Sequence, residues 1–367
     1  MAYAKCNNTT HANLAKVNNV AKANIAKINN VGVPASGATY WVGLQDDAQV
    51  SWALNANLST NGAAAWTSYD GDPTGSDTDF VCLAYGRNGS GGAHWVGTFN
   101  RDSTEIGYSA NPKDGNTWTT VDVQKRVFEL AWGNDVWIGI GKMSSNAQQL
   151  VRSTDGINWT DIDLTGVTGI GTTSVFALTT NKAGTWWFGQ DDRIFQSTDN
   201  GQSWASVHQF SGFSAGHDID NLAFTNNTLV AIASGYIYAA AVSDVTDWSS
   251  GVQMASAGSS RHLCSSAGRV CVALSAFFWT FDVNGKTITG YSADISNNVL
   301  ARTDISTQSH SGALTINTDG TTWMIGCQTG DVFWATDPVD ENSFSNYILN
   351  LNGEDLNDLK PDVILPL

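Results

Sequence analysis

A repeat that runs from residue 38 to the C-terminus, with a period of about 40 to 55 residues, constrains the fold of this chain most strongly. Each copy contains a short apolar run, such as Y-W-V-G-L around Trp41 or V-W-I-G-I around Trp137. A run with Leu at its centre precedes most of these markers, and turn residues such as Gly133-Asn134-Asp135 separate the two, which is a hairpin signature. A third alternating run and then an aromatic residue follow. The seven markers are Trp41, Trp95, Trp137, Trp187, Leu229, Val270 and Trp323, and the closing aromatics are Trp66, Trp118, Trp159, Trp204, Trp248, Tyr291 and Phe344.

These seven units of about four strands predict the architecture. One small sheet cannot bury both of its faces, whereas sheets stacked around an axis bury both and leave only short edges. The sequence therefore predicts an all-β chain, with a seven-bladed β-propeller over residues 36–367 and a short repeat segment over residues 1–35. Near the C-terminus, Val363, Ile364 and Leu365 stand between prolines and suit a short edge strand. That strand either completes the first blade or docks on a neighbouring molecule.

Composition agrees with this fold and excludes some functions. Only 14% of residues are charged, and glycine and tryptophan are abundant, which suits short strands and tight turns. With a net charge of −16 and only 18 Lys and Arg, the chain lacks the clustered positive charge that nucleic-acid binding needs. No apolar run of about 18 residues is present, and the first residues show no secretory signal. We therefore expect that the protein is made in a cytoplasm and does not insert into a membrane.

The five cysteines follow no metal-ligand spacing. Cys264 and Cys271 could face each other across a hairpin, but buried free thiols are the interpretation that we adopt. The six histidines are scattered, and no nucleotide-binding loop is present, so no cofactor is expected. In the loop D-G-D-P-T-G-S-D-T-D, the carboxylates of Asp70, Asp72, Asp77 and Asp79 could bind Ca²⁺. The loop lacks EF-hand spacing, so an ordinary solvated acidic loop is the preferred reading.

Three related tracts, here called the aspartate turns, each follow a predicted strand. They read S-T-D-N-G-Q-S-W from Ser197, S-T-D-G-I-N-W from Ser153, and a looser copy from Ser109 to Trp118. In such a turn the Asp carboxylate accepts backbone N–H bonds, the Gly adopts positive φ, and the Trp packs between strands or blades. We assign these residues to structure: Ser109, Asp114, Gly115, Trp118, Ser153, Asp155, Gly156, Trp159, Ser197, Asp199, Gly201 and Trp204.

The aspartate turns resemble the Asp-box of sialidase-like (BNR-repeat) β-propellers, in which such turns lie on the rim, away from the central site. The resemblance to sialidases also implies an Arg-Ile-Pro motif, three clustered Arg, a Tyr and a Glu. This chain has no Arg-Ile-Pro, and only eight Arg and four Glu. Arg152 and Arg193 stand before two aspartate turns in equivalent places, as repeated surface residues would. We therefore expect no enzymatic activity, and a hydrolase that uses two Asp remains as an alternative.

The N-terminal segment has a repeat of its own, with a period of eleven residues: A-K-C-N-N-T at Ala4, A-K-V-N-N-V at Ala15 and A-K-I-N-N-V at Ala26. Two structures compete. Asn-Asn can make tight turns between very short strands, because Asn tolerates left-handed backbone angles. Alternatively, Leu14, Val17, Ala21, Ile25 and Ile28 line one face of a helix with a right-handed supercoil. The paired Asn and the β-branched residues weaken a helix, so turns and short strands are preferred.

These tandem A-K-[IV]-N-N-V tracts resemble the N-termini of tailed-bacteriophage virion proteins of the tail, neck or fibre. The resemblance implies a non-enzymatic virion component, made in a host cytoplasm, whose N-terminal repeats dock to other virion proteins as a homo-oligomer. Its propeller would then be displayed to bind protein or glycan on a host surface. A glycan-binding or glycoside-hydrolysing propeller and an intracellular assembly-factor propeller are the alternatives.

Overall fold

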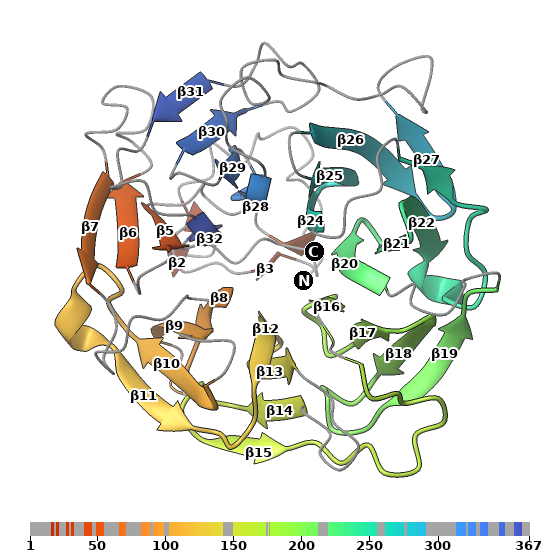
Figure 1. Ribbon diagram of the computed structural model, residues 1–367, viewed down its shortest axis with the longest axis horizontal. Helices are drawn as coiled ribbons and strands as arrows, with labels where there is room; N and C mark the ends of the chain where they lie inside the picture. The colour runs from red at the N-terminus through yellow and green to blue at the C-terminus, as the bar shows by residue number, and fades with distance from the viewer. Residues whose placement is uncertain are drawn as a thin grey trace.

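The computed structural model describes residues 16–17, 20–21, 27–28 and 31–32, and most of residues 40–361. Within 40–361 the described part excludes 46–48, 55–65, 71–81, 99–102, 142–149, 212–218, 255–260, 275–276, 291–312, 328–330, 337–344, 349–355 and positions 89, 91, 174, 176 and 321. Seven four-stranded antiparallel sheets stand around a central axis, as Figure 1 shows. The chain is a seven-bladed β-propeller, which confirms the predicted fold class.

The blades are numbered in chain order, and each is given from its innermost to its outermost strand. Blade 1 holds β32 (Leu356–Pro361), β5 (Tyr40–Gln45), β6 (Gln49–Leu54) and β7 (Trp66–Asp70). Blade 2 holds β8 (Cys82–Arg87), β9 (Ala93–Thr98), β10 (Glu105–Ser109) and β11 (Thr119–Asp122). Blade 3 holds β12 (Val127–Gly133), β13 (Val136–Gly141), β14 (Leu150–Ser153) and β15 (Trp159–Asp161). Blade 4 holds β16 (Ala177–Thr180), β17 (Trp186–Gln190), β18 (Arg193–Ser197) and β19 (Ala205–Gln209).

The remaining blades repeat the same order. Blade 5 holds β20 (Ile219–Thr225), β21 (Thr228–Ala233), β22 (Tyr236–Ala241) and β23 (Val252–Gln253). Blade 6 holds β24 (Arg261–Ser266), β25 (Arg269–Leu274), β26 (Phe277–Asn284) and β27 (Thr287–Gly290). Blade 7 holds β28 (Ala313–Thr318), β29 (Trp323–Cys327), β30 (Asp331–Ala335) and β31 (Ser345–Ile348). Two short 3₁₀ helices, η4 (Gly115–Thr117) and η5 (Val242–Asp244), complete the described elements of the ring.

All seven apolar markers lie on the second strand of a blade, as predicted. The second strands are the most deeply buried, because both faces of each sheet pack against neighbouring blades; every residue of β13 is buried. The tight hairpin between β12 and β13 is also confirmed, since Asn134 and Asp135 have φ of 50° and 58°, the left-handed values that a two-residue turn of this kind needs.

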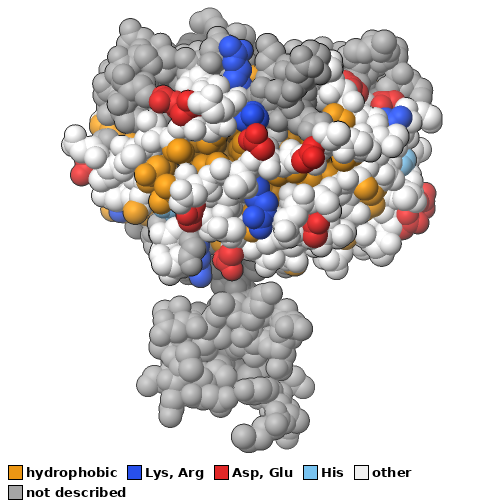
Figure 2. All heavy atoms as spheres, turned by 90° about the horizontal axis from the view of Figure 1, so that it is seen from below, with side chains coloured by type: hydrophobic (Ala, Val, Ile, Leu, Met, Phe, Trp, Pro, Cys, Tyr) orange, Lys and Arg blue, Asp and Glu red, His pale blue; other side chains and the backbone are white. Residues whose placement is uncertain are grey.

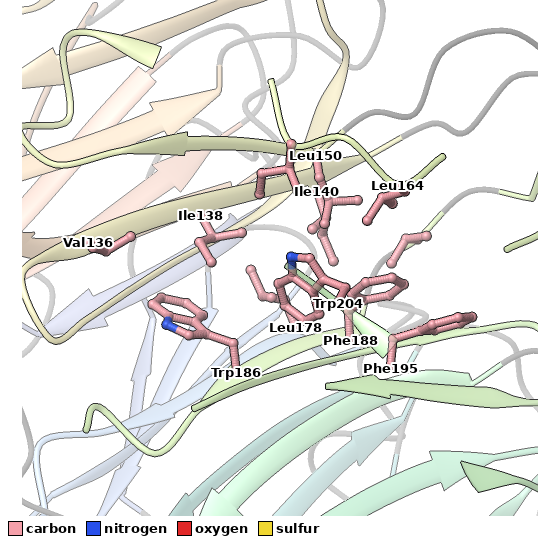
Figure 3. Close-up of a cluster of buried hydrophobic side chains, with 12 residues drawn as sticks. Val136, Ile138, Ile140, Leu150, Leu164, Leu178, Trp186, Phe188, Phe195 and Trp204 are labelled. Atoms are coloured by element: carbon pink, nitrogen blue, oxygen red, sulfur yellow. The ribbon is translucent and has the colours of Figure 1, made fainter. Parts of the chain in front are cut away.

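The core lies between blades. In Figure 3, Ile138 and Leu150 of blade 3 face Phe188 and Trp204 of blade 4 across one such layer. Equivalent clusters join blades 1 and 2, 2 and 3, 4 and 5, and 5 and 6. Burying a side chain of this size contributes roughly 1.5–3 kcal/mol to the stability of the fold. Packing in these layers is therefore the main interaction that holds the described ring together.

The C-terminal strand closes the ring. Strand β32 pairs antiparallel with β5, which places Asp358 opposite Leu44 and Pro361 opposite Trp41. Blade 1 therefore combines its innermost strand from the C-terminal end of the chain with three strands from the N-terminal part of the ring. The C-terminal strand therefore completes the first blade and does not dock on a neighbouring molecule. The closing strand, Leu356–Pro361, precedes the predicted residues Val363, Ile364 and Leu365, which lie outside the described part of the chain.

The closing strand also bonds to blade 2. The backbone N–H of Leu83, on β8, donates to Oδ2 of Asp358 at 2.8 Å, and both groups are buried. Oδ1 of the same carboxylate lies 3.5 Å from Nζ of Lys360. The Asp358 side chain therefore joins the first blade to the second, beside the pairing of the last described strand with β5.

Short strands are present in the N-terminal segment. Strands β1 (Lys16–Val17) and β2 (Val20–Ala21) form one hairpin, and β3 (Lys27–Ile28) and β4 (Val31–Gly32) form another with the same register. The two hairpins are eleven residues apart, the period of the sequence repeat. Val17, Ala21 and Ile28 lie in strands, as preferred, and not in a helix, whereas Leu14 and Ile25 of the helical alternative lie outside the described residues.

Replacing Asp358 with Ala should destabilise the ring. The buried N–H of Leu83 then loses its acceptor, which costs about 1–3 kcal/mol in the free energy of unfolding. Urea unfolding of the full chain measures this loss. Asp161→Ala is the matched control, because its carboxylate is 63% exposed and its ion pair within the described part of the chain is with Lys125; an ion pair of so exposed a carboxylate contributes little. Equal losses for the two variants would contradict the role given to Asp358.

Candidate functional site

In the second aspartate turn, one carboxylate oxygen holds the backbone of the turn. Oδ1 of Asp155 accepts hydrogen bonds from the N–H groups of Ile157 at 2.9 Å and Asn158 at 2.7 Å, and from the hydroxyl of Ser153 at 2.9 Å. The Ser153 oxygen accepts in turn from the N–H of Gly156 at 2.8 Å. Burial alone raises the pKa of Asp155, but these bonds and the Asn158 amide together lower it to about 2.

The third turn repeats this arrangement. Oδ1 of Asp199 accepts from the N–H groups of Gln202 at 3.0 Å and Ser203 at 2.9 Å, and from the hydroxyl of Ser197 at 2.7 Å. Gly201 N–H donates to the Ser197 oxygen at 2.9 Å. Burial again raises the pKa of Asp199, and the hydrogen bonds outweigh it and lower the pKa to about 2.

The glycines of these two turns allow close contact between blades. Gly156 and Gly201 have φ of 75° and 83°, which other residues rarely adopt. A Cβ on Gly156 would lie 3.0 Å from Cγ2 of Val96, and one on Gly201 would lie 2.2 Å from Cδ1 of Ile138. Both contacts are to the second strand of the preceding blade. Each turn therefore packs its own blade onto the one before it.

The tryptophans close the same turns. The indole N–H of Trp159 donates to the carbonyl of Gly156 at 3.3 Å, and that of Trp204 donates to the carbonyl of Gly201 at 3.2 Å. Trp204 is buried and packs on Phe188, with ring centroids 4.8 Å apart. Trp159 is the first residue of β15, and Trp204 directly precedes β19.

The first, looser turn has a different geometry. Here Asp114 caps the 3₁₀ helix η4, and its Oδ1 accepts from the N–H of Asn116 at 3.1 Å. The indole of Trp118 donates to the hydroxyl of Tyr69, on blade 1, at 3.1 Å. The inserted residues of this copy therefore replace the short turn with a helical one, but the contact with the preceding blade is kept.

The aspartate turns do not form a common site. Each lies between the third and fourth strands of its own blade, on blades 2, 3 and 4. The serines that end the third strands are buried; they are Ser109, Ser153 and Ser197. Because the first strands line the axis, these turns lie at the outer side of the ring, and no described contact brings their carboxylates together.

The central cavity is the candidate binding site. It has a volume of about 280 Å³ and lies on the axis of the ring. Residues of all seven innermost strands line it, and the remaining lining residue is Lys182, from the turn between β16 and β17. Its charged lining residues are two acids and two lysines: Glu129, Asp358, Lys182 and Lys360.

Polar side chains gather near the start of the innermost strands. The pairing register shifts just before Glu129 on β12, Asn221 on β20 and Asp358 on β32, and such bulges re-aim side chains. On β24, His262 occupies the second position of its strand. These four residues, which line one end of the cavity, are called the polar ring below.

Electrostatic interactions couple three blades within the cavity. Burial raises the pKa of Glu129 to about 8. The ammonium of Lys360 opposes this increase, and the carboxylate of Asp358 adds to the increase. Burial lowers the pKa of Lys360, but Asp358, Glu129 and the Cys82 thiol outweigh it and raise the pKa. At neutral pH, Glu129 is therefore mainly protonated and can donate a hydrogen bond as well as accept one.

No arginine cluster stands in this cavity. Arg152 donates from Nε to the carbonyl of Asn200 at 3.0 Å, and Arg193 donates to Oε1 of Gln209 at 2.6 Å, both on outer strands. Among the described residues, none of the cavity-lining side chains is an arginine. On the side of the molecule that Figure 2 shows, Lys and Arg side chains stand singly near Asp and Glu.

The cavity residues were not identified from the sequence. Glu129 interrupts an apolar run, V-F-E-L-A-W, and a charged residue in such a strand is a usable signal for a lined channel. Asp358 and Lys360 stand in a tail that shows no strong strand pattern, so nothing local points to them.

Other predicted sites give limited results. Cys264 and Cys271 pair across the hairpin of blade 6, and both are buried free thiols, as predicted. Within the described residues no group of His, Cys, Asp and Glu could hold a metal ion. The acidic loop falls outside that part, since only the backbone of Asp70 is described, at the end of β7. Among the described helices, none has the length and apolar character to cross a membrane.

His94 on β9 is a buried imidazole at the joint between blades 2 and 3. It is 4% exposed, and neither ring nitrogen has a hydrogen-bond partner among the described residues. The ring stacks on Tyr108 at 5.5 Å, and its edge contacts Trp137. Burial lowers the pKa of His94, and Asp155 partly opposes this. The fold therefore holds the neutral form.

Replacing Asp155 with Ala should cost about 1–2 kcal/mol of stability, because two backbone N–H groups lose a charged acceptor. The difference from the wild type should be present above pH 4 and vanish as the pH falls towards 2, since the folded carboxylate has the lower pKa. Urea unfolding at several pH values measures this. Thr154→Ala, at an exposed neighbour, is the control and should change nothing. A pH-independent difference would contradict the prediction.

Replacing His94 with Leu should make the stability less dependent on pH, so that acidification destabilises the variant less than the wild type. The folded pKa of His94 lies below its ordinary value of 6.5, so stability is full above that pH and falls as the pH drops through the folded pKa. The half-buried His208, whose pKa burial also lowers, keeps part of the slope in the variant. Thermal unfolding between pH 7.5 and 5 tests this. If the midpoint of the variant depends on pH as that of the wild type does, burial does not lower the pKa of His94.

No protein-family model and no curated protein sequence matches the chain. Solved structures do match in fold. YCF48 bound to a D1 peptide is 13% identical, with a TM-score of 0.51, over 75% of this chain and 83% of that one. Nidogen from a nidogen–laminin complex is 10% identical (TM-score 0.49; 88% and 98%), and YCF48 from Cyanidioschyzon merolae is 15% identical (TM-score 0.49; 75% and 87%). At these identities the likeness shows the propeller fold alone.

Proposed function

We propose that the chain is a non-enzymatic structural component of a tailed-phage virion, in the tail, neck or fibre. Its N-terminal repeats dock to other virion proteins, and the propeller is displayed as a head that binds protein or glycan on a host surface. The likeness of the A-K-[IV]-N-N-V tracts to virion proteins and of the aspartate turns to Asp-box propellers suggests this combination.

Repetition in the N-terminal segment supports docking. The two hairpins share one register at the eleven-residue period, and each strand has only two residues. Isolated hairpins of this length are not stable in water, so they need a partner surface. A repeat of identical hairpins also suits a homo-oligomeric assembly in which copies pack side by side.

The observation that carries the proposal is the end of the ring at which the N-terminal segment is attached. Strand β5 begins beside Pro361, at the end of β32, whereas Asp358 pairs with Leu44 further along β5. The N-terminal segment therefore joins the ring at the end of the channel opposite to the polar ring. An anchored chain would turn its polar ring away from the particle, towards a ligand outside.

The contacts of the cavity favour binding over catalysis. A sialidase needs converging positive charge for its anionic sugar, whereas Arg152 and Arg193 stand on third strands and bond at the outer side of the ring. Asp358 is 7% exposed and already accepts from Leu83, which suits a structural carboxylate more than a nucleophile.

Glycoside hydrolysis is the second candidate, and one observation favours it. Glu129, with a pKa of about 8, is a carboxylic acid at neutral pH and shares the cavity with a second carboxyl, Asp358. A protonated acid beside another carboxylate is the arrangement that glycosidases use. Turnover of a glycoside by the wild type, abolished in Glu129→Gln, would favour this candidate over the first.

Deleting residues 1–35 should separate docking from folding. The remaining chain keeps all strands of the ring and should unfold with the midpoint of the full chain, but it should be missing from purified particles. Mass spectrometry of particles from cells that make either form measures incorporation. Full incorporation of the deletion form would contradict docking through the repeats, and recovery of the full chain with host complexes instead of particles would contradict the virion role.

A further inference from the structure

We propose that the central cavity binds a short saccharide that needs no anionic group. This deepens the proposed function, on which it rests, because it names the ligand class of the displayed head.

Hydrogen-bonding groups of several kinds face the polar end of the cavity. Glu129 supplies a carboxyl, Asn221 an amide and His262 an imidazole, from three different blades. All three side chains are half-buried, so they line solvent-accessible space. Saccharide hydroxyls both donate and accept hydrogen bonds, and a mixed set of groups matches them better than a lining of one type.

Aromatic rings line the same cavity further along the innermost strands. Tyr85 pairs with Trp95, and Trp132 pairs with Trp137, at the same position of blades 2 and 3. Phe224 takes the corresponding place on blade 5, where it stacks on Trp187 with centroids 5.8 Å apart and planes 9° apart. The three rings are half-buried and lie about three residues, or roughly 10 Å, beyond the polar ring.

A ligand that spans both parts must have polar edges and an apolar face. A pyranose ring has hydroxyls around its edge and C–H groups on its faces, which pack on aromatic rings. Peptides of mixed sequence share some of this chemistry, but the polar groups and the aromatic rings in one narrow channel favour a compact ligand. The volume of about 280 Å³ lies just below the roughly 300–1,000 Å³ of typical ligand pockets, which suits a small ligand.

The charges of the cavity argue against a requirement for an anion. Lys360 lies 3.5 Å from Asp358, which offsets its charge. Among the described lining residues, Lys182, in the turn between β16 and β17, is then a single further cation and not a cluster. The described side chains of the lining include no arginine. Binding of a carboxylated or phosphorylated sugar commonly uses clustered cations with bidentate geometry, which this lining lacks.

Saturation-transfer NMR on the full chain tests the inference. The probes are the methyl glycosides of glucose, galactose, mannose and N-acetylglucosamine, with N-acetylneuraminic acid as the anionic comparison. At least one neutral glycoside should receive saturation from the wild type. Phe224→Leu keeps an apolar side chain on Trp187 but removes the ring, and it should weaken binding about 2- to 10-fold. Asn221→Ala should weaken it by a similar factor.

Gln253→Ala is the matched control, because Gln253 is exposed on β23, the outermost strand of blade 5. It should bind as the wild type does, and the unfolding midpoint of each variant separates loss of binding from loss of fold. The inference is overturned if no neutral glycoside binds, if only the anionic sugar binds, or if both cavity variants bind normally. These readouts do not depend on incorporation into particles, so failure of saccharide binding and failure of the virion role can be told apart.

Discussion

The pairing of β32 with β5 is the constraint on which the ring depends. Seven sheets bury both faces only if the first and the last are joined, because otherwise two blades expose an apolar face. At this junction β32 pairs with β5 through the backbone, and the buried N–H of Leu83 donates a hydrogen bond to the Asp358 carboxylate. Since β32 spans residues 356–361, the described propeller is complete only after these residues are made. Its central cavity exists only in the closed ring.

Most of the fold could be predicted because it depends on repeated local patterns. The apolar markers are long enough in each copy to identify second strands, and paired Asn or Asp residues identify tight turns, as at Asn134-Asp135. Ring closure could not be predicted in detail. Val363–Leu365 have a stronger strand pattern than the closing strand, whose Asp358 and Lys360 face the channel instead of a hydrophobic layer. A strand beside a polar channel loses the apolar signal on which prediction depends.

The candidate site shows the same limit. The aspartate turns are easily recognised, since their residues act on near neighbours, and they hold blades together at the outer side. The cavity is made of single residues from seven blades, so no short tract contains it. His94 was visible in the sequence as part of a marker, yet its unpartnered burial follows only from contacts with Tyr108 and Trp137 of two blades. Local motifs in this chain therefore describe the scaffold, and long-range geometry makes the site.

The closed ring is the central claim, and hydrogen exchange of the full chain tests it most directly. Strand β5 and strand β32 are paired along their length, so amides of residues 40–45 and 356–361 that lie in the ladder should exchange as slowly as those of β13. Peptides from these segments, followed by mass spectrometry from seconds to days, give the comparison. Slow exchange in both is the predicted result. Rapid exchange in both, with β13 still protected, would show an open ring and contradict this account.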